Sequence, residues 1–114
     1  MTKVTFYENN GRYTGFKAEG HAGFADKGSD IVCSSISILV INTVNSLEEL
    51  CNERMDVRED EEKGLISMDL CNTWSDDAQL LLRSLKLGLD RISEEYGKKH
   101  LKVITKEVND NVKA

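Results

Sequence analysis

Apolar and polar residues alternate along five short stretches of the chain, and apolar residues recur every three to four positions along two longer ones. Alternation is typical of β-strands with one buried face, and the longer period is typical of amphipathic helices. The pattern predicts strands at residues 3–8, 13–19, 55–59, 65–71 and 101–107, and helices at residues 31–52 and 76–96. We therefore expect an α+β fold of order β-β-α-β-β-α-β, a two-layer sandwich with both helices packed on one face of a mixed five-stranded sheet.

Residues with special turn and capping preferences support these boundaries. Asn9-Asn10-Gly11 is typical of a two-residue hairpin turn between the first two strands. Ser75 is a suitable N-cap for the second helix, and Gly97 suits the left-handed position that ends a helix. In the second strand, strict alternation places Thr14, Phe16 and Ala18 on one face and Tyr13, Gly15, Lys17 and Glu19 on the other.

The first helix has apolar residues on two sides. A rotation of 100° per residue gathers a core stripe, with Cys33 at its edge, that consists of Val32, Ile36, Leu39, Val40, Thr43, Leu47 and Leu50. Ile31, Ile38 and Ile41 lie on the opposite side. This is more apolar surface than packing on one sheet requires, so we expect the second side to be a subunit interface or a substrate groove.

Length and charge limit the class of protein. A chain of 114 residues without a long linker fits one domain, residues 1–114. Its net charge of −5 disfavours direct binding to nucleic acid and favours a basic protein partner. We find no apolar signal region before the first strand and no run approaching the ~20 apolar residues of a membrane span, so we expect a cytoplasmic protein without a membrane partner.

The three cysteines, Cys33, Cys51 and Cys71, are widely spaced. Their number and spacing favour free thiols in a reducing compartment over a disulfide framework or a paired-cysteine metal site. Cys51 and Cys71 fall among predicted core positions, where thiols are usually inert. Cys33 differs from them because it lies at the predicted start of a helix.

The stretch from Gly20 to Cys33 joins a histidine to a cysteine through a glycine-containing loop. His21 follows a strand end, and Cys33 is the third helical residue if Asp30 is the N-cap, although Ser29 could also cap. Free amides at a helix start stabilise a thiolate and could bind an oxyanion. His21 could activate such a nucleophile and protonate the leaving amine. A small core cysteine and a solvated histidine fit the same pattern.

Other residues of this region have candidate supporting roles. Gly20, Gly23 and Gly28 would make the loop a gate over the site. Asp30 could cap the helix or orient His21, and Ser37, one turn beyond Cys33, could bond near the thiolate. A zinc site made of His21, Cys33 and Asp26 or Asp30 lacks paired-ligand spacing, so we expect no metal and no cofactor.

Two further charged groups are expected to be surface features. The acidic turn Glu61-Glu62-Lys63-Gly64 is typical of a solvated hairpin tip. His100 lies beside Lys98 and Lys99 at a predicted helix end, where a positive charge interacts well with the helix dipole.

Gly20-His21-Ala22, followed by Asp30-Ile31-Val32-Cys33 and the helix beginning Ser34-Ser35, resembles the bacterial ribosomal-processing cysteine protease family, Prp. The resemblance implies a homodimeric endopeptidase in which Cys33 is the nucleophile and His21 the general base. It implies a substrate as well, the short N-terminal extension of large-subunit ribosomal protein number twenty-seven, with aromatic residues before the cut. Members of the family commonly have two alanines where this chain has Ser34 and Ser35.

Two other classes of function fit the same residues. One is a non-enzymatic dimeric binding protein associated with ribosome assembly, which would use the open sheet face or the Ile38 and Ile41 side of the helix. The other is a redox- or metal-responsive thiol protein. We favour the cysteine protease, with the N-terminal peptide of the basic ribosomal protein as its substrate.

Overall fold

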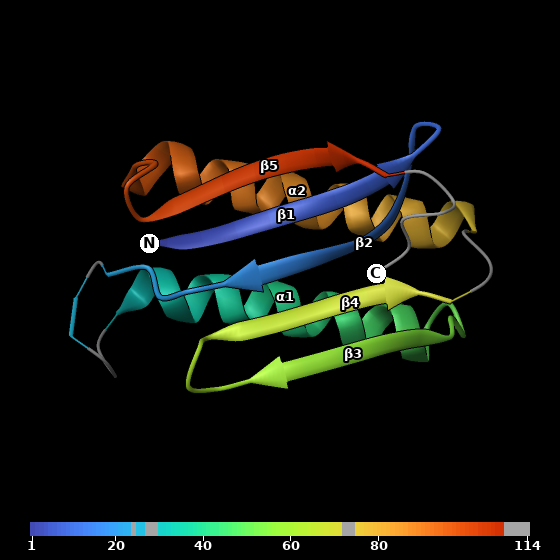
Figure 1. The fold of residues 1–114 in the computed structure, drawn as a ribbon, viewed down its shortest axis with the longest axis horizontal. Coiled ribbons are helices and arrows are strands. Elements are labelled where there is room, and N and C mark those ends of the chain that lie inside the picture. Colours follow the sequence, from blue (N-terminus) through green and yellow to red (C-terminus); the bar gives the residue numbers. More distant parts are fainter. Residues whose placement is uncertain (24, 27–29, 72–74, 109–114) are drawn as a thin grey trace.

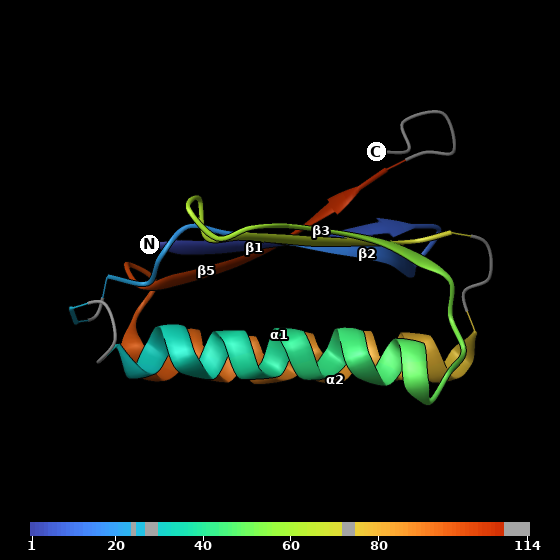
Figure 2. The ribbon, with the colours of Figure 1, turned by 90° about the horizontal axis from the view of Figure 1, so that it is seen from below.

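The computed structural model describes residues 1–23, 25–26, 30–71 and 75–108. Its elements are β1 (Thr2–Asn9), β2 (Arg12–Glu19), α1 (Ile31–Glu49), β3 (Met55–Asp60), β4 (Leu65–Leu70), α2 (Asp76–Tyr96) and β5 (Leu101–Glu107). The strands form one sheet in the order β3-β4-β2-β1-β5, in which β1 and β5 are parallel and the other neighbours antiparallel (Figure 1). Both helices lie on one face of the sheet (Figure 2). The predicted two-layer α+β sandwich is confirmed.

The core lies between the helices and the sheet. α1 contributes the buried residues Val32, Ile36, Val40, Thr43 and Leu47. This is most of the predicted stripe, but the prediction was wrong for Leu50, which is 77% exposed. α1 ends at Glu49 rather than at residue 52, and Leu50 is its C-cap, beyond the last turn that faces the sheet.

By length and composition α1 could cross a membrane, contrary to our expectation that no segment comes near this limit. Core helices of soluble proteins share these properties. In this structure the buried stripe of α1 packs against the sheet together with residues from β1, β2 and β4 such as Phe6, Phe16 and Met68.

A β-bulge in β2 changes the predicted facing of its residues. The register between β1 and β2 passes from Tyr7 opposite Gly15 to Glu8 opposite Tyr13, so Thr14 is the additional residue. Tyr13 was expected on the face opposite Phe16. The bulge turns its ring to the core side instead, with its centroid 5.3 Å from that of Phe6.

The buried Gln79 of α2 satisfies the backbone at this bulge. Its Oε1 accepts a hydrogen bond from Tyr13 N, and its Nε2 donates to Tyr13 O, both at 2.7 Å. The amide thus satisfies both backbone groups of Tyr13 beside the bulge, and it ties α2 to β2.

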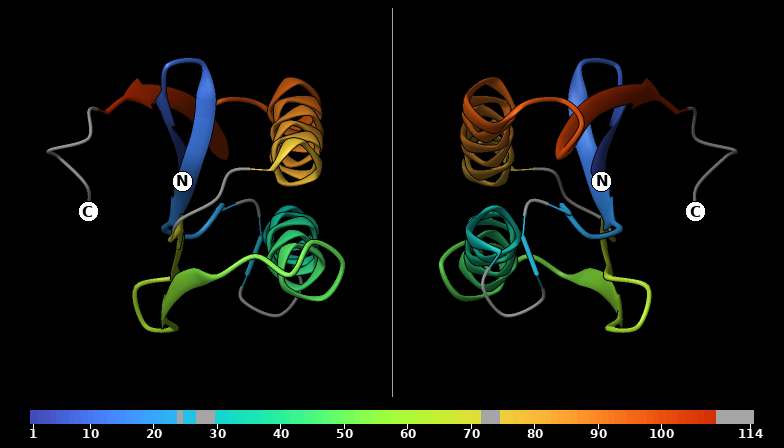
Figure 3. Two further views of the ribbon diagram at one scale, coloured as in Figure 1. Left: turned by 90° about the vertical axis from the view of Figure 1, so that its right-hand side faces the viewer. Right: turned by 90° about the vertical axis from the view of Figure 1, so that its left-hand side faces the viewer.

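The sides of both helices that face away from the sheet carry exposed apolar residues. Figure 3 shows α1 and α2 as neighbours on the same side of the sheet, and Gly88 of α2 allows a close approach of Leu39 of α1. We define the outer apolar face as Ile31, Ile38, Leu80 and Leu87, each more than half exposed. The second apolar side predicted for the first helix, which also included Ile41 (51% exposed), is therefore exposed, and α2 extends it.

Candidate active site

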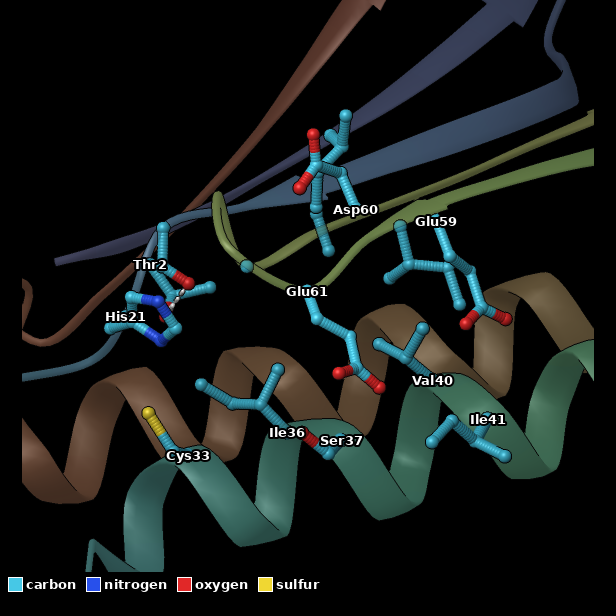
Figure 4. A pocket seen from close by; sticks show the side chains of 15 residues that line it. Thr2, His21, Cys33, Ile36, Ser37, Val40, Ile41, Glu59, Asp60 and Glu61 are labelled. Atoms are coloured by element: carbon cyan, nitrogen blue, oxygen red, sulfur yellow. Dashed lines mark hydrogen bonds between the residues drawn. The ribbon is translucent and has the colours of Figure 1, made fainter. Parts of the chain in front are cut away.

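A pocket of about 290 Å³ lies between the start of α1, the end of β2 and the β3–β4 hairpin. Cys33 and Ser37 line it from α1, His21 from the segment after β2, and Gly64 from the hairpin turn. Figure 4 shows the Cys33 sulfur directed from α1 toward the His21 ring on the opposite wall. The structure thus brings the two predicted catalytic residues to one cavity.

Asp30 caps α1 and places Cys33 in the first turn. The Asp30 Oδ1 atom accepts hydrogen bonds from Val32 N at 3.0 Å and Cys33 N at 2.9 Å. Its Oδ2 accepts from Ala25 N at 3.4 Å. The carboxylate is buried, so these bonds are shielded from solvent. Of the two roles considered for Asp30, the structure supports capping, and it adds an anchor for the preceding loop.

The same bonds bear on the prediction that amides at the start of this helix could bind an oxyanion. Val32 N and Cys33 N donate to the Asp30 carboxylate, and Ser34 N donates to Asp30 O at 3.1 Å. These first-turn amides are therefore already satisfied and are not the free donors that the sequence suggested.

The Cys33 sulfur instead has a donor from outside its helix. Ala22 N donates a hydrogen bond to Cys33 Sγ at 3.1 Å. Ala22 itself is 1% exposed and belongs to the core. Sequence reasoning missed this contact, although the position of Ala22 directly after His21 was a signal that the same loop approaches the cysteine. An N–H directed at sulfur favours negative charge there.

His21 is exposed at the edge of the pocket, and its ring lies against the hairpin turn. A Cβ on Gly64 would lie 2.9 Å from His21 Cε1 and 3.1 Å from Nε2, so only glycine leaves room for the ring here. Within the described part of the chain, no hydrogen bond joins His21 to Cys33. A direct contact through which His21 could activate the thiol is thus not formed in this state, in which the sulfur accepts a hydrogen bond from Ala22.

The glycines of the predicted gate differ in their surroundings. Gly20 has φ +90° and is fixed, because its N donates to Lys63 O at 3.3 Å and its O accepts from Thr2 Oγ1 at 3.4 Å. Gly23 has φ +68° and open space around it. Gly28 and the alternative cap Ser29 lie outside the described residues.

The serines near Cys33 have different orientations. Ser37 lines the pocket and is exposed. Its hydroxyl forms no hydrogen bond with another residue in the described ranges. Ser34 Oγ and Ser35 Oγ donate to the carbonyls of Asp30 and Ile31, one turn earlier, at 3.2 and 2.7 Å. Neither serine lines the pocket, so their hydroxyl groups do not shape the cavity.

The acidic hairpin is part of the pocket rather than only a solvated tip. Glu59, Asp60 and Glu61 are among the lining residues. In Figure 4 the Glu59 and Glu61 side chains extend toward α1, whereas Asp60 extends the other way and its Oδ1 accepts from Lys63 N at 3.3 Å. The prediction was incomplete because the turn pattern shows where the chain reverses but not what the turn packs against.

The other two thiols lie elsewhere. Cys51 and Cys71 follow the ends of α1 and β4 and are half-buried, so the prediction of core positions was wrong for both. Burial raises the pKa of the Cys51 thiol, as do the nearby Asp77 and Glu53 carboxylates. Within the described ranges, no three His, Cys, Asp or Glu side chains are grouped so that they could hold a metal ion.

A family model described as cysteine protease Prp matches residues 1–110. The chain belongs to the Prp family of cysteine proteases. The ribosomal processing cysteine protease Prp of Staphylococcus aureus (strain Mu50 / ATCC 700699) is 34% identical over 88 residues, which cover 77% of this chain and 83% of that protein. Prp of Bacillus subtilis (strain 168) is 30% identical over 96 residues, with 79% and 83% covered.

Solved Prp structures share the whole fold. A crystal structure of Prp from S. aureus with a covalently linked product peptide has a TM-score of 0.87 at 32% identity, covering 93% of this chain and 100% of that one. A second, with a substrate peptide, has a TM-score of 0.82 at 31% identity and the same coverage. As a Prp protease, the chain is an enzyme that hydrolyses peptide bonds.

Proposed function

We propose that Cys33 is the nucleophile and His21 the general base of this protease. We further propose that its substrate is the short N-terminal extension of large-subunit ribosomal protein number twenty-seven. The observation that carries the proposal is the shared pocket, where the Cys33 sulfur at the capped start of α1 faces the His21 ring (Figure 4). On this reading residues 1–114 form one cysteine protease domain.

The reaction proceeds in two halves. His21 takes the thiol proton, and the Cys33 sulfur attacks the carbonyl carbon of the scissile peptide to give a tetrahedral intermediate. His21 then gives its proton to the leaving amine, the C–N bond breaks, and a thioester remains on Cys33. A water molecule, deprotonated by His21, attacks the thioester. The carboxyl product leaves, and the thiol is restored.

The free enzyme needs a small rearrangement before this chemistry. Cys33 Sγ accepts a hydrogen bond from Ala22 N, and the His21 ring rests against Gly64. Catalytic contacts in free enzymes are often loose and tighten when substrate binds. We propose that a peptide in the pocket brings the ring to the sulfur.

Three supporting roles belong to the proposal. Asp30 holds the helix start, and Ser37, on the pocket wall one turn from Cys33, binds a polar group of the substrate or the intermediate. The loop that contains Gly20, Gly23 and Gly28 admits the peptide. Since Gly20 is bonded to both neighbouring segments, movement would begin at Gly23.

A basic ribosomal peptide fits the charge of the site. Glu59 and Glu61 extend toward the pocket, and the chain carries a net charge of −5. S. aureus relatives are named as ribosomal processing proteases, and one of their structures holds a substrate peptide. We propose a cytoplasmic enzyme that meets this protein without binding nucleic acid itself.

We also propose a homodimer. The outer apolar face leaves four large apolar side chains in solvent on adjacent helices. Exposed patches of this kind are common at subunit interfaces, and a second copy would cover them.

The proposal is tested with a synthetic peptide that spans the N-terminal extension and the first residues beyond it. Mass spectrometry follows its cleavage by the wild-type enzyme, Cys33→Ala and His21→Ala, with Cys71→Ala as the control for loss of a thiol outside the pocket. We expect a single cut by the wild type and the control and none by Cys33→Ala.

The same experiment separates the other hypotheses. Cleavage by Cys33→Ala would exclude that residue as the nucleophile. Binding of the peptide without cleavage by the wild type would favour the non-enzymatic assembly protein. Cleavage of an unrelated peptide, but not of the ribosomal peptide, would support the protease activity and contradict the proposed substrate.

A further inference from the structure

We propose that His100 is a positioning residue that holds Ala22 so that its N–H stays on the Cys33 sulfur. The inference rests on the proposed role of Cys33 and adds a residue from the far end of the chain. The surface position expected for His100 does not describe it, because its side chain is half-buried and turned toward the loop that carries His21.

Two hydrogen bonds form a relay through Ala22. His100 Nδ1 lies 3.0 Å from Ala22 O. Ala22 N donates to Cys33 Sγ at 3.1 Å. Ala22 is thus fixed on both sides of its Cα, and its methyl group is buried. The next residue, Gly23, has open space where a Cβ would lie. The bond from His100 therefore holds the last packed residue before this open position.

His100 is itself held by regular structure. Its N donates to Gly97 O at the end of α2, and its O accepts from Thr2 N at the start of β1, both at 3.0 Å. β5 begins at the next residue, Leu101, which is fully buried. The ring is therefore carried by a rigid junction of helix and sheet, which is a suitable support for a catalytic loop.

The contact determines which ring nitrogen of His100 carries a proton. A carbonyl oxygen only accepts hydrogen bonds, so the Nδ1 atom of His100 has to carry the proton. The proposed role of His100 therefore depends on its Nδ1–H group. His100 does not line the pocket, so it acts on the sulfur through Ala22 and not through the substrate.

A matched pair of variants tests this role. Asn and Leu have similar size, but only Asn can place an N–H near the position of Nδ1. We expect His100→Leu to lower kcat and the rate of Cys33 alkylation by iodoacetamide roughly 3- to 10-fold, the size of one hydrogen bond, with KM unchanged. We expect His100→Asn and the exposed neighbour Lys99→Leu to stay within about twofold of wild type. Equal losses in the Asn and Leu variants would overturn the proposal.

A measurement on the wild-type protein covers the case in which His100→Leu does not fold. Long-range ¹H–¹⁵N spectra of the imidazole distinguish its two neutral forms. The proposal requires the proton on Nδ1 of His100, and a neutral ring protonated on Nε2 would overturn it.

These readouts are independent of the substrate. The alkylation rates and the ring spectrum need no peptide, so they test His100 even if the wild type does not cut the ribosomal peptide. If the alkylation rate of Cys33 is the same in the wild type and in a stably folded His100→Leu variant, His100 does not position the thiol.

Discussion

Cys33 and Cys51 are thiols in opposite surroundings. Burial and the carboxylates of Asp77 and Glu53 raise the pKa of Cys51, so its thiolate is scarce at neutral pH. The Cys33 sulfur accepts an N–H bond from Ala22 and lies in the first turn of α1, where the helix dipole favours negative charge. The contacts of the two thiols therefore differ in the direction that the proposed role of Cys33 requires.

Replacing Asp30 tests the support of this position. Asp30→Ala removes the acceptor of two helix amides and of Ala25 N, and we expect a loss of roughly 1–2 kcal/mol in the free energy of unfolding. Cleavage should fall as well, because Cys33 loses its fixed place. Urea unfolding and peptide cleavage measure the two effects.

Asp30→Asn is the control, because asparagine caps helices about as well as aspartate. It should keep most of the stability. If Asp30→Ala were as stable and as active as the wild type, Asp30 would not support the site.

At this scale the sequence predicted the local contacts and missed the distant ones. His21, Cys33 and Asp30 lie within thirteen consecutive positions, and capping preferences alone indicate how Asp30 and Cys33 meet. The contact of His100 with Ala22 spans 78 positions. No local pattern can indicate such a pair, because it depends on how β5 pairs with β1.

At the scale of elements, the bulge in β2 depends on one side chain of α2. Gln79→Leu leaves Tyr13 N and Tyr13 O without their partners at a part-buried position. We expect a loss of about 2–4 kcal/mol in the free energy of unfolding, since each backbone group left unpaired costs about 1–2 kcal/mol. Chemical denaturation measures it.

Glu95→Leu is the control, because Glu95 of α2 is exposed and lies outside the outer apolar face, so the change should cost less than about 0.5 kcal/mol. A similar small effect of both variants would mean that water replaces the amide of Gln79 at the bulge.

Variants in the β3–β4 hairpin test whether the negative charge at the pocket contributes to binding of a basic peptide. We expect Glu59→Gln and Glu61→Gln each to raise KM for a basic peptide roughly two- to fivefold while kcat changes little, because exposed charges act weakly and at a distance from the reacting bond. The effect should shrink in high salt, which screens such charges. Steady-state kinetics at two salt concentrations measure both.

Glu95→Gln, an exposed change on α2 away from the pocket, is the matched control and should leave KM unchanged. An equal rise of KM in all three variants would assign the effect to net charge rather than to the hairpin.

Periodicity predicted the order and type of the seven elements found in the described residues. It failed where one residue breaks the period. The additional residue Thr14 moved Tyr13 to the core face, and the end of α1 at Glu49 left Leu50 in solvent. Both failures arise because a pattern assumes an unbroken element, whereas bulges and helix ends depend on tertiary partners such as Gln79.

At the scale of the whole molecule, the outer apolar face predicts self-association. We expect the wild type to sediment as a dimer at micromolar concentration and the double variant Ile38→Glu with Leu87→Glu to sediment as a folded monomer, because charge opposes burial of this face. Analytical ultracentrifugation with circular dichroism measures both properties.

Leu50→Glu, at a still more exposed apolar position at the end of α1, is the control and should remain dimeric. A monomeric wild type, or a double variant that stays dimeric, would place the interface elsewhere or exclude it.

The sandwich explains why a small chain can hold this site. The sheet order places β2 between β4 and β1, so the segment after β2 lies between the β3–β4 hairpin and the start of β5 (Figure 1). The layer below supplies the capped start of α1. The sequence predicted the layers but not the strand order, and it is the strand order that brings Gly64, His21 and His100 to one end of the molecule.

The central claim is that Cys33 is an activated nucleophile. Its most direct test is the rate of alkylation of each cysteine by iodoacetamide at neutral pH, followed by peptide mapping in the wild type and in His21→Ala. We predict that Cys33 reacts at least roughly tenfold faster than Cys51 and Cys71 and that this advantage shrinks in His21→Ala. Equal, slow reaction of all three thiols would contradict the account.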